Sequence, residues 1–425
     1  MGLRKDDFIV GFALFALFFG VGNIVLPPML GFLAGQEWYL VAIGFIITAI
    51  GIPLLGIFAH ARIQGTMYDF GKPVSKVFSL IFCIFIYSIS AAIPSPRTAA
   101  FTYEMAFEPF FNISPLAVSI LYFGLVFIFV AKRSTVLNNI GKYITPAILI
   151  LILGMIFFGI FEDTETMKVS SLKTPILDGF FEGYQTFDAI GALVVGGVII
   201  ISEKLKGYNN QVEAKKLITK AAIISALGLL IIYCGLIYEG ALFGHLFSED
   251  VTRTQLLSGI SSLTLGPYAS ICLAILVSLA CFTTAVGIVT GTADFFSDQF
   301  KYKYSYITSV TTACLFGIVV GAFSVDFIIT LALPILMLVY PLTIVLIILN
   351  ILSDKLRHQL IMKLVVIFTS IFSIPDALKV IAPDSQIISS ISNSIPLSNF
   401  GLGWLIPAAF AFGIGYLITL RKPIT

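Results

Sequence analysis

The residues of this chain that could do chemistry are few, and they lie inside long apolar stretches. Asn23 lies in FFGVGNIVLPPML, residues 18–30, and Asp188 lies in GYQTFDAIGALVVGG, residues 183–197. Thr283 and Thr284 follow Ala280 in the run ACFTT. Small hard cations prefer oxygen ligands, and a carboxylate buried among apolar residues is usually there for a function. The pattern therefore favours the binding of small charged groups.

Catalytic chemistry is not expected. His60, His245 and His358 are far apart in the sequence and show neither H-x-x-x-H nor H-E-x-x-H spacing, so a metal centre or a catalytic triad is not indicated. No cluster of catalytic polar residues is visible that would mark a membrane-embedded enzyme. We expect a protein that is not an enzyme.

The first stretch carries several residues that continue a helix poorly. Gly20, Gly22, Asn23, Pro27 and Pro28 all fall within it. The two prolines cannot donate to the carbonyls four residues back, so we expect an inner half-helix that ends near 18–20 and an outer half that begins near 24–28. The partly positive N-terminus of the outer half suits a carboxylate, and the exposed carbonyls of the inner half suit a cation.

Asp188 marks a second interruption. It lies about ten residues inside its apolar run, where a bare carboxylate costs several kcal/mol. Gly191 follows closely, and we expect local unwinding there. The alternative is that Asp188 merely hydrogen-bonds a neighbour in an unbroken helix, since glycine is common in transmembrane helices.

The composition identifies the elements that must position these residues. Of 425 residues, 58% are hydrophobic and 11% are charged, against roughly 25% charged in soluble domains. The mean hydropathy is +1.02. We therefore predict an all-α integral membrane protein. The net charge of +2 gives no case for nucleic acid as a partner.

At about 20 residues per span, the chain divides into twelve expected transmembrane helices. They cover residues 8–34, 39–59, 77–107, 115–131, 140–161, 178–202, 216–244, 267–296, 305–323, 327–349, 361–374 and 402–420. With the N-terminus inside, 20 of the 25 Lys and Arg residues fall on the inner side. Basic residues favour the cytoplasmic side, so we expect both termini in the cytoplasm.

The two interrupted spans are the first and the sixth, which would cross the membrane in opposite directions. Such a pair is typical of a 5+5 inverted repeat. We expect one transmembrane domain over 1–425, with repeats at 8–161 and 178–350 and two peripheral helices within 361–420. The eighth span would place Thr283 and Thr284 on one face beside the Ala280 carbonyl, although hydroxyls in such helices commonly bond to their own backbone.

Four segments resemble a known family. FFGVGNIVLPPMLG (18–31), SPRTAAFTYE (95–104), EGYQTFDAIGALVVG (182–196) and LACFTTAVGIVTG (279–291) are similar to segments of the bacterial branched-chain amino acid:cation symporters, the system II carriers. The resemblance runs from about residue 5 to 420. It departs at SAAIPS, before Pro96, where the family pattern has a Gly-Pro.

The resemblance implies a leucine-transporter-like fold and import of leucine, isoleucine or valine together with Na⁺ by alternating access. It also implies a Na⁺ site formed by Ala280, Thr283 and Thr284 with carbonyls near Ala16 and Phe19. The resemblance implies a location in the bacterial plasma membrane, so we expect the lipid bilayer to surround the protein. No obligate protein partner is evident.

The expected substrate site lies at the two interruptions. It is formed by Phe19, Gly20, Gly22, Asn23, Phe187, Asp188 and Gly191. The substrate carboxylate would lie on half-helix N–H groups, its ammonium on freed carbonyls, and its side chain among apolar residues. Asn23 could serve the substrate or a second cation. Proton coupling or exchange, with Asp188 titrating, stays open as an alternative to Na⁺, and a channel is a further rival.

Other charged residues lie near the ends of spans. Arg97, Glu104 and Glu108 could close an outer gate, but we favour the interpretation that they simply reach water. Glu239 and Asp294 are likewise expected to be solvated.

Overall fold

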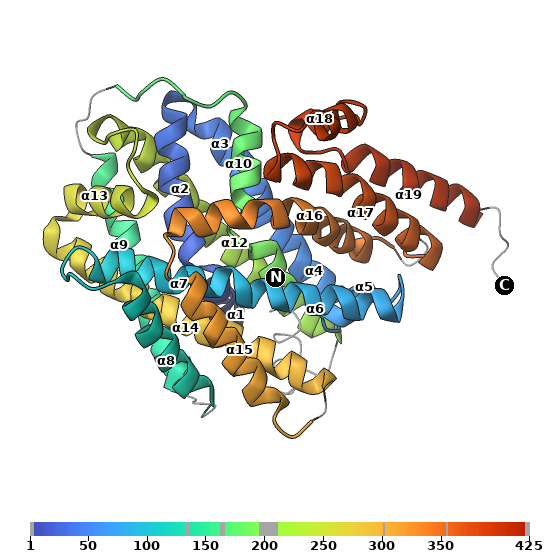
Figure 1. Cartoon of the computed structure of the whole chain (residues 1–425), viewed down its shortest axis with the longest axis horizontal. Helices are drawn as coiled ribbons and strands as arrows, with labels where there is room; N and C mark the ends of the chain where they lie inside the picture. Colours follow the sequence, from blue (N-terminus) through green and yellow to red (C-terminus); the bar gives the residue numbers. More distant parts are fainter. Residues whose placement is uncertain are drawn as a thin grey trace.

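The computed structural model describes residues 4–131, 136–161, 166–194, 211–300, 302–353 and 356–420, and their regular structure is helical throughout (Figure 1). The remaining residues include the inner part of the expected sixth span, 195–202. They also include Lys132, Arg133, Lys204, Lys206, Lys301, Lys355, Arg421 and Lys422, on which part of the orientation argument rests. These residues lie outside the description that follows.

The first half of the chain contains the elements of the expected first five spans. They are α1 (Lys5–Phe18), α2 (Val21–Ala34), η1 (Gly35–Glu37), α3 (Trp38–Ile46), η2 (Ile47–Gly51), α4 (Ile52–Ile63), α5 (Met67–Gly71), α6 (Lys76–Ala92), α7 (Pro94–Thr102), η3 (Tyr103–Phe107), α8 (Pro115–Ala131) and α9 (Val136–Ile160).

The second half contains α10 (Pro175–Tyr184), a helical segment over 188–194, α12 (Gln211–Phe243), η4 (Gly244–Leu246), α13 (Arg253–Leu265), α14 (Pro267–Gln299), α15 (Ser305–Val320), α16 (Val325–Ile351), α17 (Gln359–Ile381), α18 (Gln386–Asn393), η5 (Ser398–Phe400) and α19 (Leu405–Leu420). The eleventh span was expected to be short, over 361–374, but α17 is longer because its helix continues through Pro375.

Six helical stretches of the described residues are long and apolar enough to cross a membrane: Val21–Ile63, Lys76–Phe107, Lys215–Leu246, Ser270–Gln299, Val325–Ile351 and Gln359–Ile381. Four shorter apolar helices are Pro115–Ala131, Pro146–Ile160, Ser305–Val320 and Leu405–Leu420. Length and composition thus single out six spans, not the twelve expected. One reason is that Val21–Ile63 contains the second half of the expected first span and the whole of the second: α2 and α3 lie side by side and are joined by η1 (Figure 1).

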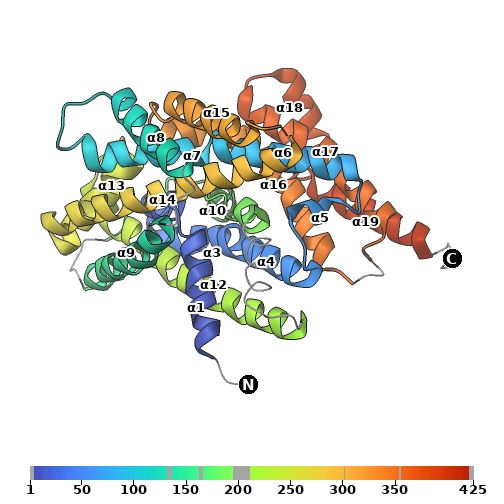
Figure 2. The ribbon, with the colours of Figure 1, turned by 90° about the horizontal axis from the view of Figure 1, so that it is seen from below.

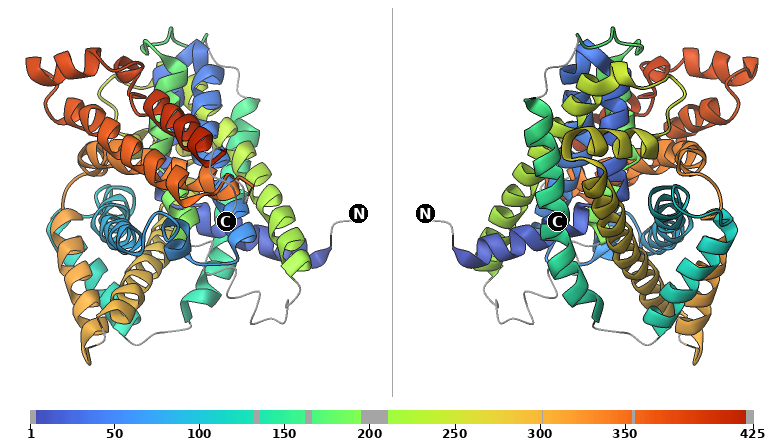
Figure 3. Two further views of the ribbon diagram at one scale, coloured as in Figure 1. Left: turned by 90° about the vertical axis from the view of Figure 1, so that its right-hand side faces the viewer. Right: turned by 90° about the vertical axis from the view of Figure 1, so that its left-hand side faces the viewer.

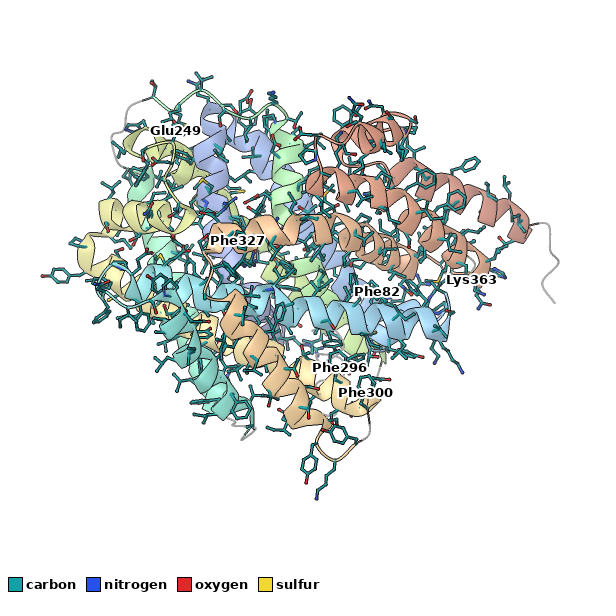
Figure 4. All side chains as sticks on the ribbon, viewed as in Figure 1. Phe82, Glu249, Phe296, Phe300, Phe327 and Lys363 are labelled. Carbon is teal, nitrogen blue, oxygen red and sulfur yellow. The ribbon has the colours of Figure 1, made fainter. Side chains whose placement is uncertain are left out.

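The outside of the bundle is strongly apolar. Large side chains project from the helices, among them Phe300 and Phe327, which are labelled in Figure 4 and are each about half exposed. Water-soluble monomers rarely expose apolar surface on this scale, whereas a lipid environment favours it. The observation agrees with the prediction of an α-helical membrane protein.

The core of the bundle is formed around α2, whose residues are all buried except Leu33. α2 packs closely on α12, because Gly31 faces the Ile237 carbonyl and Gly240 faces the Pro28 carbonyl with no side chain between the backbones. Small residues allow membrane helices to approach in this way. α1 diverges from α2 and also packs on α12 (Figures 2 and 3).

Candidate functional site

The first span is interrupted between α1 and α2. α1 ends at Phe18, Gly20 adopts extended backbone with φ −108° and ψ −171°, and α2 begins at Val21. The Gly20 N–H donates to the Phe18 carbonyl at 2.9 Å. A regular helix would direct that N–H to the Ala16 carbonyl, so the interruption deprives Ala16 of its helical donor.

The predicted end of the inner half near 18–20 is confirmed, but the predicted start of the outer half near 24–28 is wrong. Pro27 and Pro28 lie inside α2, in its second turn and beyond. Each removes one helical hydrogen bond, yet the helix continues through them because α2 is buried along its whole length against α12 and other helices. Gly20, rather than either proline, is where the chain changes direction.

The second interruption follows α10, which ends at Tyr184. Gln185 and Thr186 form a turn, Phe187 has a left-handed φ of +63°, and residues 188–194 are helical again. A bulky residue in this region is unusual and costs about 1 kcal/mol or more. The expected local unwinding beside Asp188 is confirmed, but it lies at 185–187 and not at Gly191, whose N–H donates to the Phe187 carbonyl at 2.8 Å within the new helix.

Three polar side chains connect the two interruptions. The Asn23 amide donates to Asp188 Oδ2 at 2.6 Å and also to the Tyr233 hydroxyl. The Tyr233 hydroxyl donates to the same Asp188 oxygen at 3.3 Å. Asn23 is 1% exposed, Asp188 4% and Tyr233 0%. We call these residues the Asn23–Asp188–Tyr233 cluster. It brings together two residues selected from the sequence, 165 positions apart, and one that was not selected.

Tyr233 was missed because it lies in the middle of the apolar run 216–244, which carries no proline and no charged residue close to it. The available signal was the tyrosine itself, since a buried tyrosine hydroxyl needs a hydrogen-bond partner. Its ring contacts Phe45 edge-on, with the centroids 5.2 Å apart. This contact fixes the direction of the hydroxyl towards the interruptions.

Arg97 is also part of this region, and the expectation that it reaches water is wrong. It lies in α7, is 3% exposed, and its Nη1 donates to the Gln185 carbonyl at 2.7 Å. Its guanidinium carbon is 5.5 Å from the centre of the Phe187 ring. The reason is length: helical structure continues through η3 to Phe107, so Arg97 is ten residues from the end of the run and not at its outer edge.

The aromatic residues expected to line an apolar pocket are both buried. Phe187 lies under the Arg97 guanidinium, whereas Phe19 stacks on Phe15 with the ring centroids 5.0 Å apart. Beside the second interruption, Tyr184 stacks on Tyr340 at 4.1 Å. Gly191 faces open space, because a Cβ added there would meet no atom within 4 Å.

The residues of the expected cation site lie on α1 and α14. The Thr283 hydroxyl donates to the Ala280 carbonyl at 2.8 Å, the backbone bond that the sequence left open as an alternative. Thr284 is partly buried, and Ala16 is exposed. α14 packs mainly on α7, α15, α13 and α9, whereas α1 packs mainly on α12. The donor set, namely hydroxyls and carbonyls, has the chemistry that Na⁺ requires.

Charged residues form a separate group on the side of the interruptions that is expected to face outward. Arg253 of α13 donates to Glu182 Oε1 at 3.1 Å and to Asp326. Glu104 accepts from the Thr254 hydroxyl at 2.7 Å and from the Val325 N–H at 2.8 Å. Between this group and α2 lies a cavity of about 310 Å³. Glu104 therefore connects three elements and does not simply reach water.

The remaining charged residues give a mixed result. Glu108 and Asp294 are exposed, as expected. Glu239 is 0% exposed, and the expectation that it is solvated is wrong. Its carboxylate lies against Gly159 of α9, where the missing side chain leaves room for it.

Comparison with known proteins identifies the family. Residues 3–422 match the family model described as branched-chain amino acid transport protein. This chain belongs to that family. It is 34% identical to the branched-chain amino acid permease BraB of Bacillus subtilis, over 98% of this chain and 96% of that protein. It is 33% identical to the branched-chain amino acid transport system 2 carrier protein of Pseudomonas aeruginosa, over 96% and 94%.

Solved structures agree on the fold. The inward-facing conformation of Mhp1 superimposes with a TM-score of 0.62 at 12% identity, covering 98% of this chain and 91% of that one. Its closed conformation with a bound hydantoin gives 0.60 at 13% identity, covering 98% and 92%. The protein is accordingly a branched-chain amino acid transporter with an Mhp1-like helical fold, and it is not an enzyme.

Proposed function

We propose that this branched-chain amino acid transport protein is a secondary active transporter that imports leucine, isoleucine and valine by symport with Na⁺. The observation that carries the proposal is the Asn23–Asp188–Tyr233 cluster, which joins two interrupted helices through buried polar side chains. Polar groups in the middle of membrane helices are costly and usually mark a substrate or ion pathway.

The interruptions supply both kinds of polar group that an amino acid needs. The substrate ammonium binds the Asp188 carboxylate and carbonyls near Gly20 and Phe187. The substrate carboxylate binds the N-terminus of α2, where the first N–H groups have no helical acceptor. The aliphatic side chain lies near Phe19, Phe187 and the open face of Gly191. Such a pocket separates substrates by only about 1–3 kcal/mol per methylene, which accounts for one carrier that accepts all three amino acids.

The packing of the helices supports a 5+5 inverted repeat within twelve spans. Such a repeat relates span one to six, two to seven, three to eight and four to nine. α1 and α10 begin spans one and six, while α3 and α12 belong to spans two and seven. The repeat therefore exchanges the pair α1–α12 with the pair α10–α3, and both pairs pack extensively. It also maps α7–α14 and α8–α15 onto themselves, and these pairs pack as well. Alternating access follows if the helices with interruptions rock against the others.

The proposed Na⁺ site consists of the Ala16 and Phe19 carbonyls at the end of α1 and of Ala280, Thr283 and Thr284 of α14. The release of the Ala16 carbonyl by Gly20 supports this assignment. A bound Na⁺ would supply positive charge that links the end of α1 to α14. To bind Na⁺, the Thr283 hydroxyl oxygen must direct a lone pair at the ion while its hydrogen keeps donating to the Ala280 carbonyl.

Proton coupling or exchange by the same fold is the second candidate. It is favoured by one observation: the Asp188 carboxylate accepts hydrogen bonds from two neutral side chains, those of Asn23 and Tyr233. A carboxylate in such surroundings could carry a proton through the transport cycle. The bacterial relatives support a place in the bacterial plasma membrane, and the excess of Lys and Arg on the expected inner side supports both termini in the cytoplasm.

The deciding experiment measures uptake of radiolabelled leucine into proteoliposomes under an inward Na⁺ gradient with equal pH on both sides. We expect accumulation above equilibrium, competition by isoleucine and valine, and no accumulation when K⁺ replaces Na⁺. Accumulation driven by a pH gradient without Na⁺ would instead establish the proton-coupled transporter. Saturation of uptake separates either carrier from a channel.

Thr284→Ala locates the cation site. We expect the Na⁺ concentration for half-maximal uptake to rise about tenfold, because one of few oxygen ligands is lost. Thr290→Ala, six residues further along α14, is the matched control. An unchanged Na⁺ dependence in Thr284→Ala would remove this residue from the site.

A further inference from the structure

Arg97 is a buried cation that the proposed function, as described so far, does not use. Its side chain extends from α7 into the space between the two interruptions. One nitrogen is held by the Gln185 carbonyl, while the buried Nε has no hydrogen-bond partner among the described residues. A buried guanidinium with an unsatisfied donor is costly, so this arrangement calls for a function.

Gly22 brings the guanidinium close to the first turn of α2. A Cβ added to Gly22 would lie 2.8 Å from Arg97 Nη2, and within 3.3 Å of backbone atoms of Gln185 and Thr186. Only a residue without a side chain leaves this space. α2 is a 14-residue helix, and Gly22 is its second residue. The guanidinium therefore lies beside the backbone N–H groups at the partly positive end of α2.

Asp188 directly follows Phe187, the residue whose ring the Arg97 guanidinium contacts. The Arg97 guanidinium covers the Phe187 ring, and Asp188 is the next residue in the chain, with its carboxylate turned to Asn23 and Tyr233. Arg97 and Asp188 are therefore neighbouring groups of opposite charge. The structure records no direct ion pair between them within the described residues. A basic and an acidic group thus lie at the same interruption, each with its own polar partners.

We propose that Arg97 and the first turn of α2 form a carboxylate subsite, so that the substrate is recognised as a zwitterion. The carboxylate of the amino acid binds the Arg97 guanidinium and the N–H groups at Val21 and Gly22, and its ammonium binds Asp188. A guanidinium presents several donors in one plane and matches the two oxygens of a carboxylate. This inference rests on the proposed function, because it describes the same site.

The rival role for Arg97 is that of an internal counter-charge for Asp188, without any contact to substrate. The two roles make different demands. A carboxylate subsite discriminates between ligands with and without a carboxylate. If Arg97 is only a counter-charge, its replacement changes the affinity of every ligand that binds Asp188 by the same factor.

The experiment uses purified full-length protein in detergent and measures dissociation constants by calorimetry, with ligand-induced thermal shifts as a second readout. The ligands are leucine, 3-methylbutylamine, which is leucine without the carboxylate, and 4-methylpentanoate, which is leucine without the ammonium. The variants are Arg97→Gln, Arg97→Lys and Asp188→Asn. Lys168→Gln, which removes an ion pair with the exposed Glu249, is the matched control.

For the wild type we expect leucine to bind at least about 10- to 100-fold more tightly than 3-methylbutylamine, the range typical of a lost charge-assisted contact. Arg97→Gln should weaken leucine by a similar factor and leave 3-methylbutylamine within about threefold, so that the discrimination disappears. Arg97→Lys should weaken leucine by an intermediate factor. Asp188→Asn should abolish the discrimination between leucine and 4-methylpentanoate instead.

Two results would overturn the carboxylate subsite. One is unchanged leucine binding by Arg97→Gln, and the other is an equal loss of leucine and 3-methylbutylamine, which establishes the counter-charge role. If Arg97→Gln does not yield monodisperse protein, the wild-type ligand series and Arg97→Lys decide, because equal wild-type affinity for leucine and 3-methylbutylamine also overturns the proposal. Failure of the proposed function looks different: the wild type then neither binds nor transports leucine.

Discussion

The two helix interruptions solve the same problem with different chemistry. In the first, Gly20 adopts extended backbone that any residue tolerates, and the residues at the gap, Phe19 and Gly20, carry no charge. In the second, Phe187 is held in the left-handed region and is followed by a carboxylate. The first interruption exposes main-chain groups at little conformational cost, whereas the second uses local strain to place the charge of Asp188.

The scaffolds behind the two interruptions are alike. α2 approaches α12 at Gly31 and Gly240, and α10 approaches α3 in the same way, with Gly44 against the Ile176 carbonyl and Gly179 against the Val41 carbonyl. Backbone contact of this kind holds α2 and α10 each against a neighbouring helix. The comparison teaches that the frame is shared between the two interruptions, while specificity resides in the few side chains at the gaps.

Removing the charge from the second interruption should have the largest effect. Asp188→Asn keeps the shape of the side chain but loses the carboxylate that accepts from Asn23 and Tyr233. We expect leucine uptake to fall at least about 30-fold. The proposed pair of Asp188 and the substrate ammonium is then lost, and loss of one member of a buried, hydrogen-bonded charge pair costs about 2–5 kcal/mol or more. Initial rates in proteoliposomes at equal protein content measure this.

Asp250→Asn is the matched control for Asp188→Asn, since Asp250 lies in the exposed connection between η4 and α13. It should transport leucine like the wild type. An Asp188→Asn protein that retains uptake within threefold of the wild type would show that the charge of the second interruption is dispensable, and the contrast between the two interruptions would lose its functional meaning.

Within the first interruption, the two glycines should behave differently. A Cβ at Gly22 meets the Arg97 guanidinium at 2.8 Å, whereas a Cβ at Gly20 meets nothing closer than the Asn23 side chain at 3.9 Å. We expect Gly22→Ala to weaken leucine binding about tenfold, since overpacking costs about 1–3 kcal/mol. Gly20→Ala should bind leucine like the wild type. Calorimetric titration of both variants tests the difference, and equal affinities would contradict it.

Much of this architecture could be predicted from the sequence, for identifiable reasons. Helix-breaking residues in apolar runs located both interruptions to within a few residues, and buried Asn23 and Asp188 were selected because polar groups are costly there. Arg97, Tyr233 and Glu239 were misjudged or missed, because their burial depends on where a helix ends and on which helices pack beside it. Arg97 is buried since α7 continues into η3, and Glu239 since Gly159 of another helix faces it.

The prolines of α2 should matter least, although they are the most conspicuous residues of the first interruption. Pro27 lies six residues after Val21, about 9 Å along the helix at 1.5 Å per residue, and the change of direction is made at Gly20. We expect Pro27→Ala to bind leucine within about threefold of the wild type, because the new N–H can donate to the Asn23 carbonyl as in a regular helix. Leucine titration of Pro27→Ala beside Gly22→Ala measures this. If Pro27→Ala weakened binding more than Gly22→Ala, the carbonyl that the proline frees at Asn23 would be part of the binding site, and the first interruption would extend nearly one turn beyond Gly20.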